Sequence, residues 1–199
     1  MNRRSFAAAI VFAALVLSFP AVAKSRGGLP KVRIETSLGP ILVELETKRA
    51  PLSSNNFLMY VDRKRFDGTS FYRAARSPGR PDTGLVQGGI NRFFRGALQP
   101  IAHEPTSKTG LAHVDGTVSM ARNAPGRAMG DFFITVGRAP YLDAAPNSPG
   151  YAAFGRVVAG MPVVRRILAG ATYPGGRSEA TKGQSLIKPV RIISVRRVQ

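Results

Sequence analysis

Residues 116–136 read GTVSMARNAPGRAMGDFFITV, and this stretch carries the pattern from which the rest of the chain can be interpreted. Two short runs of β-forming residues, Gly116 to Ala121 and Phe132 to Val136, predict strands. Because neighbouring side chains on a strand point to opposite faces, Phe132 and Phe133 cannot both enter the same core. We therefore expect one phenylalanine inside the protein and the other facing outward.

Further short strands are predicted on both sides of this stretch. The turn residues Ser37-Leu38-Gly39-Pro40 separate two alternating runs and indicate a hairpin. Serine, glycine and prolines from Arg76 to Thr83 predict a loop without regular structure. The strands expected outside the central stretch are Val32 to Glu35, Ile41 to Leu45, Thr69 to Ala74, Gly84 to Gln87, Ala152 to Val158 and Val190 to Val195.

Two segments have convincing helical periodicity. Phe57, Tyr60 and Val61 recur at helical spacing after a proline that a first turn tolerates, which predicts a helix from about Pro51 to Asp62. The second helix is expected from Met161 to Leu168, with an apolar side made of Val163, Val164, Ile167 and Leu168. Many short strands with two helices favour a closed or nearly closed β barrel.

The segment from Met1 to Ala23 has the three parts of a secretory signal peptide: paired arginines, an apolar run and the small-x-small pattern Ala21-Val22-Ala23. Cleavage before Lys24 would remove 23 of the 199 residues and leave 176, a single domain over residues 24–199. A retained membrane anchor is the alternative, although the apolar run is shorter than the ~20 residues of a spanning helix. Both the general secretory route and the twin-arginine route stay open.

Positive charge dominates the composition. Lysine and arginine number 29 against 11 acidic residues, a formal net charge of +18, of which Arg3 and Arg4 in the signal contribute two and leave +16. Such a field attracts polyanions and anionic membrane surfaces nonspecifically, and salt weakens the attraction. The basic residues are spread along the chain, so we expect no specific nucleic-acid partner.

The sequence lacks the residues that several kinds of chemistry require. The chain has no cysteine, and its two histidines have no neighbouring metal-ligand pattern, so neither disulfides nor a metal site is expected. No G-x-S-x-G elbow and no phosphate-binding loop is present, which removes the main support for hydrolase and nucleotide-binding functions. His103 and His113 are expected to hold loops through hydrogen bonds rather than to titrate in catalysis.

Five ordered motifs resemble those of the cyclophilins. They are Ser70-Phe71-Tyr72-Arg73, Leu85-Val86-Gln87-Gly88-Gly89, Ser119-Met120-Ala121-Arg122 leading to Asp131-Phe132-Phe133-Ile134, Tyr141-Leu142-Asp143, and Tyr151-Ala152-Ala153-Phe154-Gly155-Arg156-Val157. The resemblance spans nearly all of the chain after the signal. It implies a mainly β fold, a closed eight-stranded antiparallel barrel capped by two α-helices. It also implies peptidyl-prolyl cis-trans isomerase activity without a cofactor, with proline-containing polypeptides as partners.

The same resemblance implies a substrate groove on the outside of the barrel. Arg73 matches the family's catalytic arginine, and Gln87 matches its polar partner beside the substrate backbone. The other residues that we expect to bind substrate are Phe71, Leu85, Ala121, Arg122, Asp131, Phe133, Leu142 and Tyr151. Leu85, Phe133 and Leu142 match walls of the proline pocket.

An arginine suits this reaction on physical grounds. Resonance in the prolyl amide gives rotation a barrier of ~18–20 kcal/mol, and the twisted transition state loses that resonance and gains a nitrogen lone pair. A charged donor aimed at this nitrogen stabilises the transition state more than either planar ground state. Guanidinium is permanently protonated and presents its donors as a fixed fork.

Two departures from the family pattern leave a second function open. Gly84 stands where an aromatic pocket wall is common, which predicts a pocket open on one side, and Asp131 replaces the usual glutamine and could pair with Arg73. The first hypothesis is an active isomerase that assists the folding of exported, periplasmic proteins. The alternative is a weakly active or inactive module that binds proline peptides or acts as a chaperone.

Overall fold

The structure is a computed structural model that describes residues 28–91, 96–176 and 178–198. The predicted signal peptide therefore lies outside the described residues. In chain order the elements are β1 (Lys31–Thr36), β2 (Gly39–Leu45), α1 (Pro51–Asp62), β3 (Ser70–Ser77), β4 (Arg80–Gly89), α2 (Thr106–Thr109), β5 (Thr117–Met120), β6 (Asp131–Val136), the 3-10 helix η1 (Pro140–Leu142), β7 (Ala153–Ala159), α3 (Met161–Leu168), β8 (Thr172–Tyr173), the 3-10 helix η2 (Glu179–Thr181) and β9 (Ser185–Val198).

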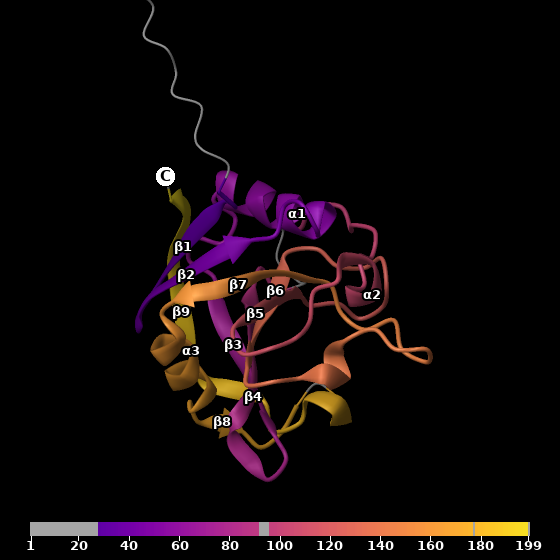
Figure 1. Cartoon of the computed structure of the whole chain (residues 1–199). Helices are drawn as coiled ribbons and strands as arrows, with labels where there is room; N and C mark the ends of the chain where they lie inside the picture. Colours follow the sequence, from indigo (N-terminus) through magenta and orange to yellow (C-terminus); the bar gives the residue numbers. More distant parts are fainter. Residues whose placement is uncertain (1–27, 92–95, 177, 199) are drawn as a thin grey trace, which may run out of the picture.

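Eight strands close into an antiparallel barrel (Figure 1). Neighbours follow the order β1-β2-β7-β5-β6-β4-β3-β9, and β9 pairs back onto β1, so the barrel has no free edge. The two-residue strand β8 adds to the outside through β9. The mainly β, eight-stranded fold expected from the sequence is confirmed.

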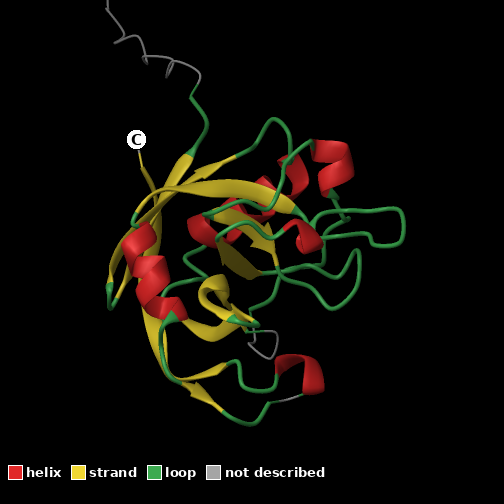
Figure 2. Ribbon diagram, turned by 60° about the horizontal axis from the view of Figure 1, so that its bottom comes forward, coloured by secondary structure: helices red, strands yellow, loops and turns green. Residues whose placement is uncertain are grey.

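Both predicted helices occur with the expected bounds. In α1 the apolar residues Phe57, Tyr60 and Val61 turn inward, and in α3 the whole predicted apolar side is buried. Figure 2 shows the helices around the outside of the strands. The one-turn helix α2 was not foreseen, because four residues are too few for periodicity to show. None of the helices in the described ranges is long and apolar enough to cross a bilayer.

An aromatic cluster fills the barrel beneath α1. The ring of Phe57 lies 4.9 Å from that of Phe66, 5.2 Å from that of Phe132 and 5.3 Å from that of Phe154, measured between centroids. Phe132 also meets Phe71 edge to face, with centroids 5.7 Å apart. Such contacts add to the stabilisation that burial of the rings provides. Phe132 is therefore the inward member of the central pair.

The structure corrects the expectation of an irregular loop from Arg76 to Thr83. Strands β3 and β4 continue through most of it, and Ser77 pairs with Arg80 across the two-residue turn Pro78-Gly79. Gly79 has φ +70°, a conformation that glycine adopts without the steric penalty of a side chain. The breaker residues therefore concentrate at a tight hairpin turn instead of dissolving the strands.

Candidate active site

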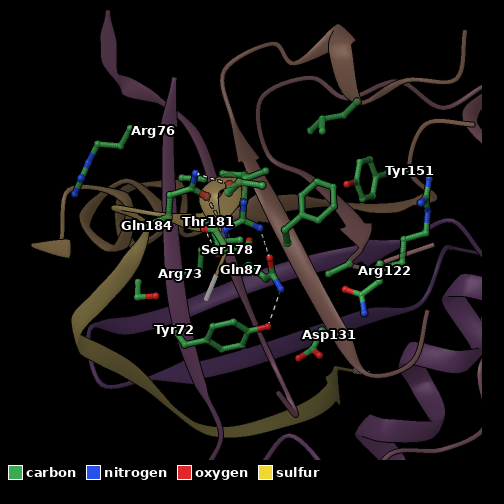
Figure 3. Close-up of a pocket in the computed structure, with 18 of the residues that line it drawn as sticks. Tyr72, Arg73, Arg76, Gln87, Arg122, Asp131, Tyr151, Ser178, Thr181 and Gln184 are labelled. Atoms are coloured by element: carbon green, nitrogen blue, oxygen red, sulfur yellow. Dashed lines mark hydrogen bonds between the residues drawn. The ribbon is translucent and has the colours of Figure 1, made fainter. Parts of the chain in front are cut away.

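A long groove of about 1080 Å³ crosses the outer face of β3, β4 and β6. It lies between the loop that follows β5 and the segment between β8 and β9 (Figure 3). An open groove of this length suits an extended peptide better than a compact small molecule. Every site residue expected from the sequence except Phe71 lines it: Arg73, Leu85, Gln87, Ala121, Arg122, Asp131, Phe133, Leu142 and Tyr151.

A β-bulge turns two consecutive side chains of β3 toward the groove. Phe71 pairs with Gly88, but Arg73 pairs with Gln87, so Tyr72 is the extra residue on β3. Regular alternation would send Tyr72 and Arg73 to opposite faces, whereas a bulge re-aims the chain locally. Tyr72 and Arg73 both line the groove, while Phe71 and Ala74 on either side are buried in the core.

Arg73 is fixed by two neutral acceptors. Its Nε donates to Gln184 Oε1 at 2.8 Å, and its Nη1 donates to Gln87 Oε1 at 2.7 Å. An arginine has five N–H donors, so three are left over from the bonds it makes to the described residues. Burial lowers the pKa of Arg73, which still leaves the guanidinium charged at neutral pH. The result is a positioned cation with donors available to a substrate.

A relay of hydrogen bonds connects Arg73 to Asp131. Gln87 Nε2 donates to the Tyr72 hydroxyl at 2.7 Å, and that hydroxyl is hydrogen-bonded in turn to Asp131. Burial first, and the charge of Asp131 second, raise the pKa of Tyr72 well above its ordinary value. Tyr72 therefore stays protonated. This chain of donors orients the Gln87 amide so that its oxygen faces Arg73.

The direct Arg73–Asp131 pair considered from the sequence does not form. The ion pairs between described residues do not include it, and Asp131 Oδ1 accepts the backbone N–H of Asn91 at 2.8 Å. Tyr72 occupies the position between the two charged groups in the relay. The Asp131 carboxylate is therefore connected to Arg73 through Tyr72 and Gln87, and it does not compete with a substrate for the N–H donors of Arg73.

An apolar pocket adjoins the polar groups. Leu85, Phe133, Ala139 and Leu142 form a buried cluster separate from the barrel core. Ala75, Ala121 and Tyr151 pack against this cluster, with the Tyr151 ring edge-on to Phe133 at 5.4 Å between centroids. Phe133 is thus the outward member of the central pair. A proline ring is the kind of small apolar group that such a pocket accepts.

His113 supports this pocket from behind. Its Nδ1 lies 2.6 Å from Asp143 Oδ1, its Nε2 lies 3.0 Å from Ser119 Oγ, and its ring stacks on Phe133. Asp143, His113 and Ser119 are linked in series, as in the catalytic triad of a serine hydrolase. Ser119 is fully buried, however, and cannot reach a substrate. Burial lowers the pKa of His113, so the neutral form is favoured. His113 is a structural residue, and His103 likewise contacts a loop, at Pro149 O.

One site expectation needs correction. Phe71 is fully buried in the barrel core, because it precedes the bulge and faces inward, so it cannot touch a substrate in the groove. Gly84 is a different case, because it contributes no side chain to the groove. It is a buried residue of β4 with φ +143°, and a Cβ there would lie 2.0 Å from Ala75 O. Position 84 is therefore a close approach of two strands that leaves no room for an aromatic wall, and the open side of the pocket stays a prediction.

Sequence reasoning missed Gln184 as a site residue. It precedes β9 and lies 111 residues from the arginine that it orients, with no motif around it. The role of the Tyr72 hydroxyl was also missed, because only the bulge brings it to the groove. The described residues contain no group of three or more His, Asp or Glu side chains that could hold a metal ion.

Comparisons with known proteins agree with this geometry. Residues 31–197 match the family described as cyclophilin type peptidyl-prolyl cis-trans isomerase/CLD. A peptidyl-prolyl cis-trans isomerase of Acinetobacter baylyi is 36% identical over 191 residues, covering 94% of this chain and 93% of the relative. Peptidyl-prolyl cis-trans isomerase A of Dickeya dadantii is 36% identical over 172 residues, covering 84% and 85%.

A solved structure shares the fold. It is the cyclophilin type peptidyl-prolyl cis-trans isomerase of Cryptosporidium parvum in the presence of the dipeptide Ala-Pro, with a TM-score of 0.64 and 21% identity. The match covers 85% of this chain and 99% of that one. Together, the family match over residues 31–197, the extent of the bacterial relatives and the barrel with its arginine-lined groove show that this chain belongs to the cyclophilin family of peptidyl-prolyl cis-trans isomerases.

Proposed function

We propose that this isomerase accelerates X-Pro rotation in exported polypeptides, in the periplasm of a bacterium. The observation that carries the location is the signal pattern of residues 1–23, whose cleavage would release the whole barrel. Prolyl isomerisation takes tens to hundreds of seconds without catalysis, so it delays folding after export. A chain without cysteine keeps its covalent structure in an oxidising compartment.

The groove supplies the parts that this reaction needs. The apolar cluster around Phe133 holds the proline ring, while the preceding carbonyl is free to rotate. Arg73 lies beside that cluster with spare N–H donors for the prolyl nitrogen lone pair of the twisted amide. Gln87 fixes the guanidinium and lies within reach of the substrate backbone. No proton transfer and no covalent intermediate is required.

The alternative, a module that binds proline peptides with little turnover, loses one of its two supports. It rested on an open pocket at Gly84 and on an Arg73 held by Asp131. Arg73 is held by Gln87 and Gln184 instead of by Asp131, whereas Gly84 supplies no side chain to the groove. Neither departure weakens the donors that face a substrate, so turnover is the function that the geometry favours.

The relay gives a prediction about Tyr72. We expect Tyr72→Phe to lower kcat/KM for an Ala-Pro peptide about fivefold, because Gln87 Nε2 loses its acceptor and a net hydrogen bond is worth about 1 kcal/mol. Tyr173→Phe is the matched control, since Tyr173 is exposed on β8 away from the groove, and it should leave kcat/KM unchanged. Equal kcat/KM for Tyr72→Phe and the wild type would show that the relay does not orient Gln87.

The location is tested by export of the full chain. We expect the periplasmic fraction to contain a protein that begins at Lys24, as measured by mass spectrometry of the intact chain. Ala23→Phe should block cleavage and retain the protein in the membrane fraction, because the cleavage site needs a small residue there. Recovery of only the full-length wild-type chain in the membrane or the cytoplasm would overturn the periplasmic proposal.

The folding role is tested separately on the chain of residues 24–199. A secreted protein whose refolding has a slow prolyl phase should refold faster when this chain is added. If the chain catalyses peptide isomerisation but leaves that phase unchanged, the activity stands and the folding role fails.

A further inference from the structure

The substrate groove carries a strong excess of positive charge. Asp131 is the only acidic side chain among the described residues that line it. The basic side chains of the lining are Arg73, Arg76, Arg80, Arg122 and Arg127. Figure 3 shows Arg122 and Arg76 at opposite ends of the groove, with Arg73 and Gln87 between them, so positive charge lies at both ends.

This charge is not neutralised within the described part of the protein. The nine ion pairs formed there, including His113–Asp143, use no residue of the groove lining. Acidic residues elsewhere are matched instead to arginines on the body of the barrel, such as Glu44 with Arg156 and Asp67 with Arg196. The groove arginines therefore keep their positive charge, whereas part of the basic charge on the body of the barrel is paired with acids.

The groove arginines that are fixed in place are held by neutral acceptors, which leaves their charge intact. Arg76 donates to the carbonyl of Gly170, and Arg122 donates to the carbonyl of Gly150. The Arg122 guanidinium also lies over the Tyr151 ring, 4.7 Å from its centroid, and its buried Nε has no hydrogen-bond partner among the described residues. A cation held in this way has lost part of its rotational freedom before any ligand arrives.

Two further arginines of the groove lining are exposed, where they can contact residues farther along a bound peptide. Arg127 is exposed on the loop that also carries Arg122, and Arg80 is exposed at the turn of the β3–β4 hairpin. Guanidinium groups recognise carboxylates by paired hydrogen bonds in addition to charge. Each end of the groove therefore has one fixed arginine and one exposed arginine.

We propose that this groove selects proline segments that are flanked by acidic residues. The proposal rests on the isomerase activity of the groove and names the class of substrate that it prefers. Asp131 does not reverse the preference, because its single negative charge is outnumbered by the five arginines of the lining. A carboxylate on either side of the proline gains from the arginines, and a lysine there is repelled.

The test compares three peptides of the form Xaa-Ala-Pro-Phe-Xaa, with Xaa as Glu, Gln or Lys and both ends blocked. Exchange NMR measures the isomerisation rate without a coupling protease, and titration of the same peptides gives Kd. At ~0.02 M salt we expect kcat/KM for the Glu peptide to exceed that for the Lys peptide at least about tenfold. At ~0.5 M salt, where the Debye length is only about 4 Å, the ratio should approach one.

Single substitutions distinguish local recognition from the overall charge of the protein. Arg122→Gln and Arg80→Gln should each lower the Glu-to-Lys ratio of kcat/KM about threefold, because each removes an arginine from a different end of the groove. Arg63→Gln is the matched control, because this substitution removes the same charge from an exposed residue just after α1 that lies outside the groove lining. It should leave the ratio and the basal rate on the Gln peptide unchanged.

Three outcomes would overturn the proposal. One is a Glu-to-Lys ratio below two at low salt; another is an equal effect of Arg63→Gln and Arg122→Gln, which would assign the preference to net charge. The third is stronger inhibition by an oligothymidylate than by the Glu peptide at equal charge, which would point to a nucleic-acid surface. Turnover of the Gln peptide reports the isomerase activity independently, and if it were absent the Kd values would still decide the preference.

Discussion

Arg73→Ala is expected to lower kcat/KM for a proline peptide by at least about 100-fold, the usual loss when one preorganised donor to a transition state is removed. The barrel should stay folded, because Arg73 lies in the groove and its bonds go to Gln87 and Gln184 rather than into the core. Exchange NMR gives the rate, and circular dichroism of the same sample gives the fold.

Arg73→Lys separates charge from geometry. An ammonium keeps the positive charge but cannot donate at the same time to Gln184, to Gln87 and to a substrate in a planar fork. We expect it to recover less than about a tenth of the lost activity. Near wild-type turnover in the alanine variant would remove Arg73 from catalysis, and full rescue by lysine would reduce its role to that of a point charge.

Gly84→Ala is expected to have the largest effect on stability. The new Cβ would lie 2.0 Å from Ala75 O and 2.9 Å from Arg76 Cα, both backbone atoms that cannot move without breaking the β3–β4 ladder. The φ of +143° adds strain to this clash. We expect the free energy of unfolding to fall by at least about 3 kcal/mol, a drop in Tm of about 10 °C for a domain of this size.

Gly79→Ala is the matched control for that experiment. Gly79 also has a positive φ, +70°, but an added Cβ would meet nothing within 4 Å. Only the conformational penalty remains, about 1 kcal/mol. Thermal unfolding of the two variants therefore separates the clash from the strain. Equal Tm values would show that the two strands do not approach as closely as Gly84 requires.

The contrast between α1 and the β3–β4 hairpin shows how far the sequence predicts the fold. Helix α1 begins at Pro51 and ends at Asp62 as expected, because proline at the start and apolar residues at helical spacing are local signals. The hairpin was mistaken for a loop, because breaker residues indicate that a turn is present without showing how short it is. Local patterns therefore located the elements better than they located their ends.

The motifs predicted the site residue by residue. The site differs from that prediction where its contacts join residues that are distant in sequence. The motifs brought Arg73, Gln87 and Phe133 to one groove as expected. They could not reveal that a bulge at Tyr72 separates inward Phe71 from outward Arg73, because a bulge depends on the register with β4. Nor could they reveal Gln184, whose contact with Arg73 exists only after β9 has paired with β3.

The closure of the barrel through β1 and β9 has a consequence for the time at which the protein can fold. Ile34 of β1 pairs with Val195 of β9, so the first and last strands of the barrel are neighbours, and the other half of β9 pairs with β3. Contacts so distant in sequence make folding slow, because the loop entropy is lost before pairing compensates for it. In a chain that emerges from the ribosome, amino end first, β1 thus lacks its β9 partner until the last strand has been made. Until Ser185 to Val198 has emerged, β1 and β3 both present an unpaired edge, and Gln184 has not yet been brought to Arg73.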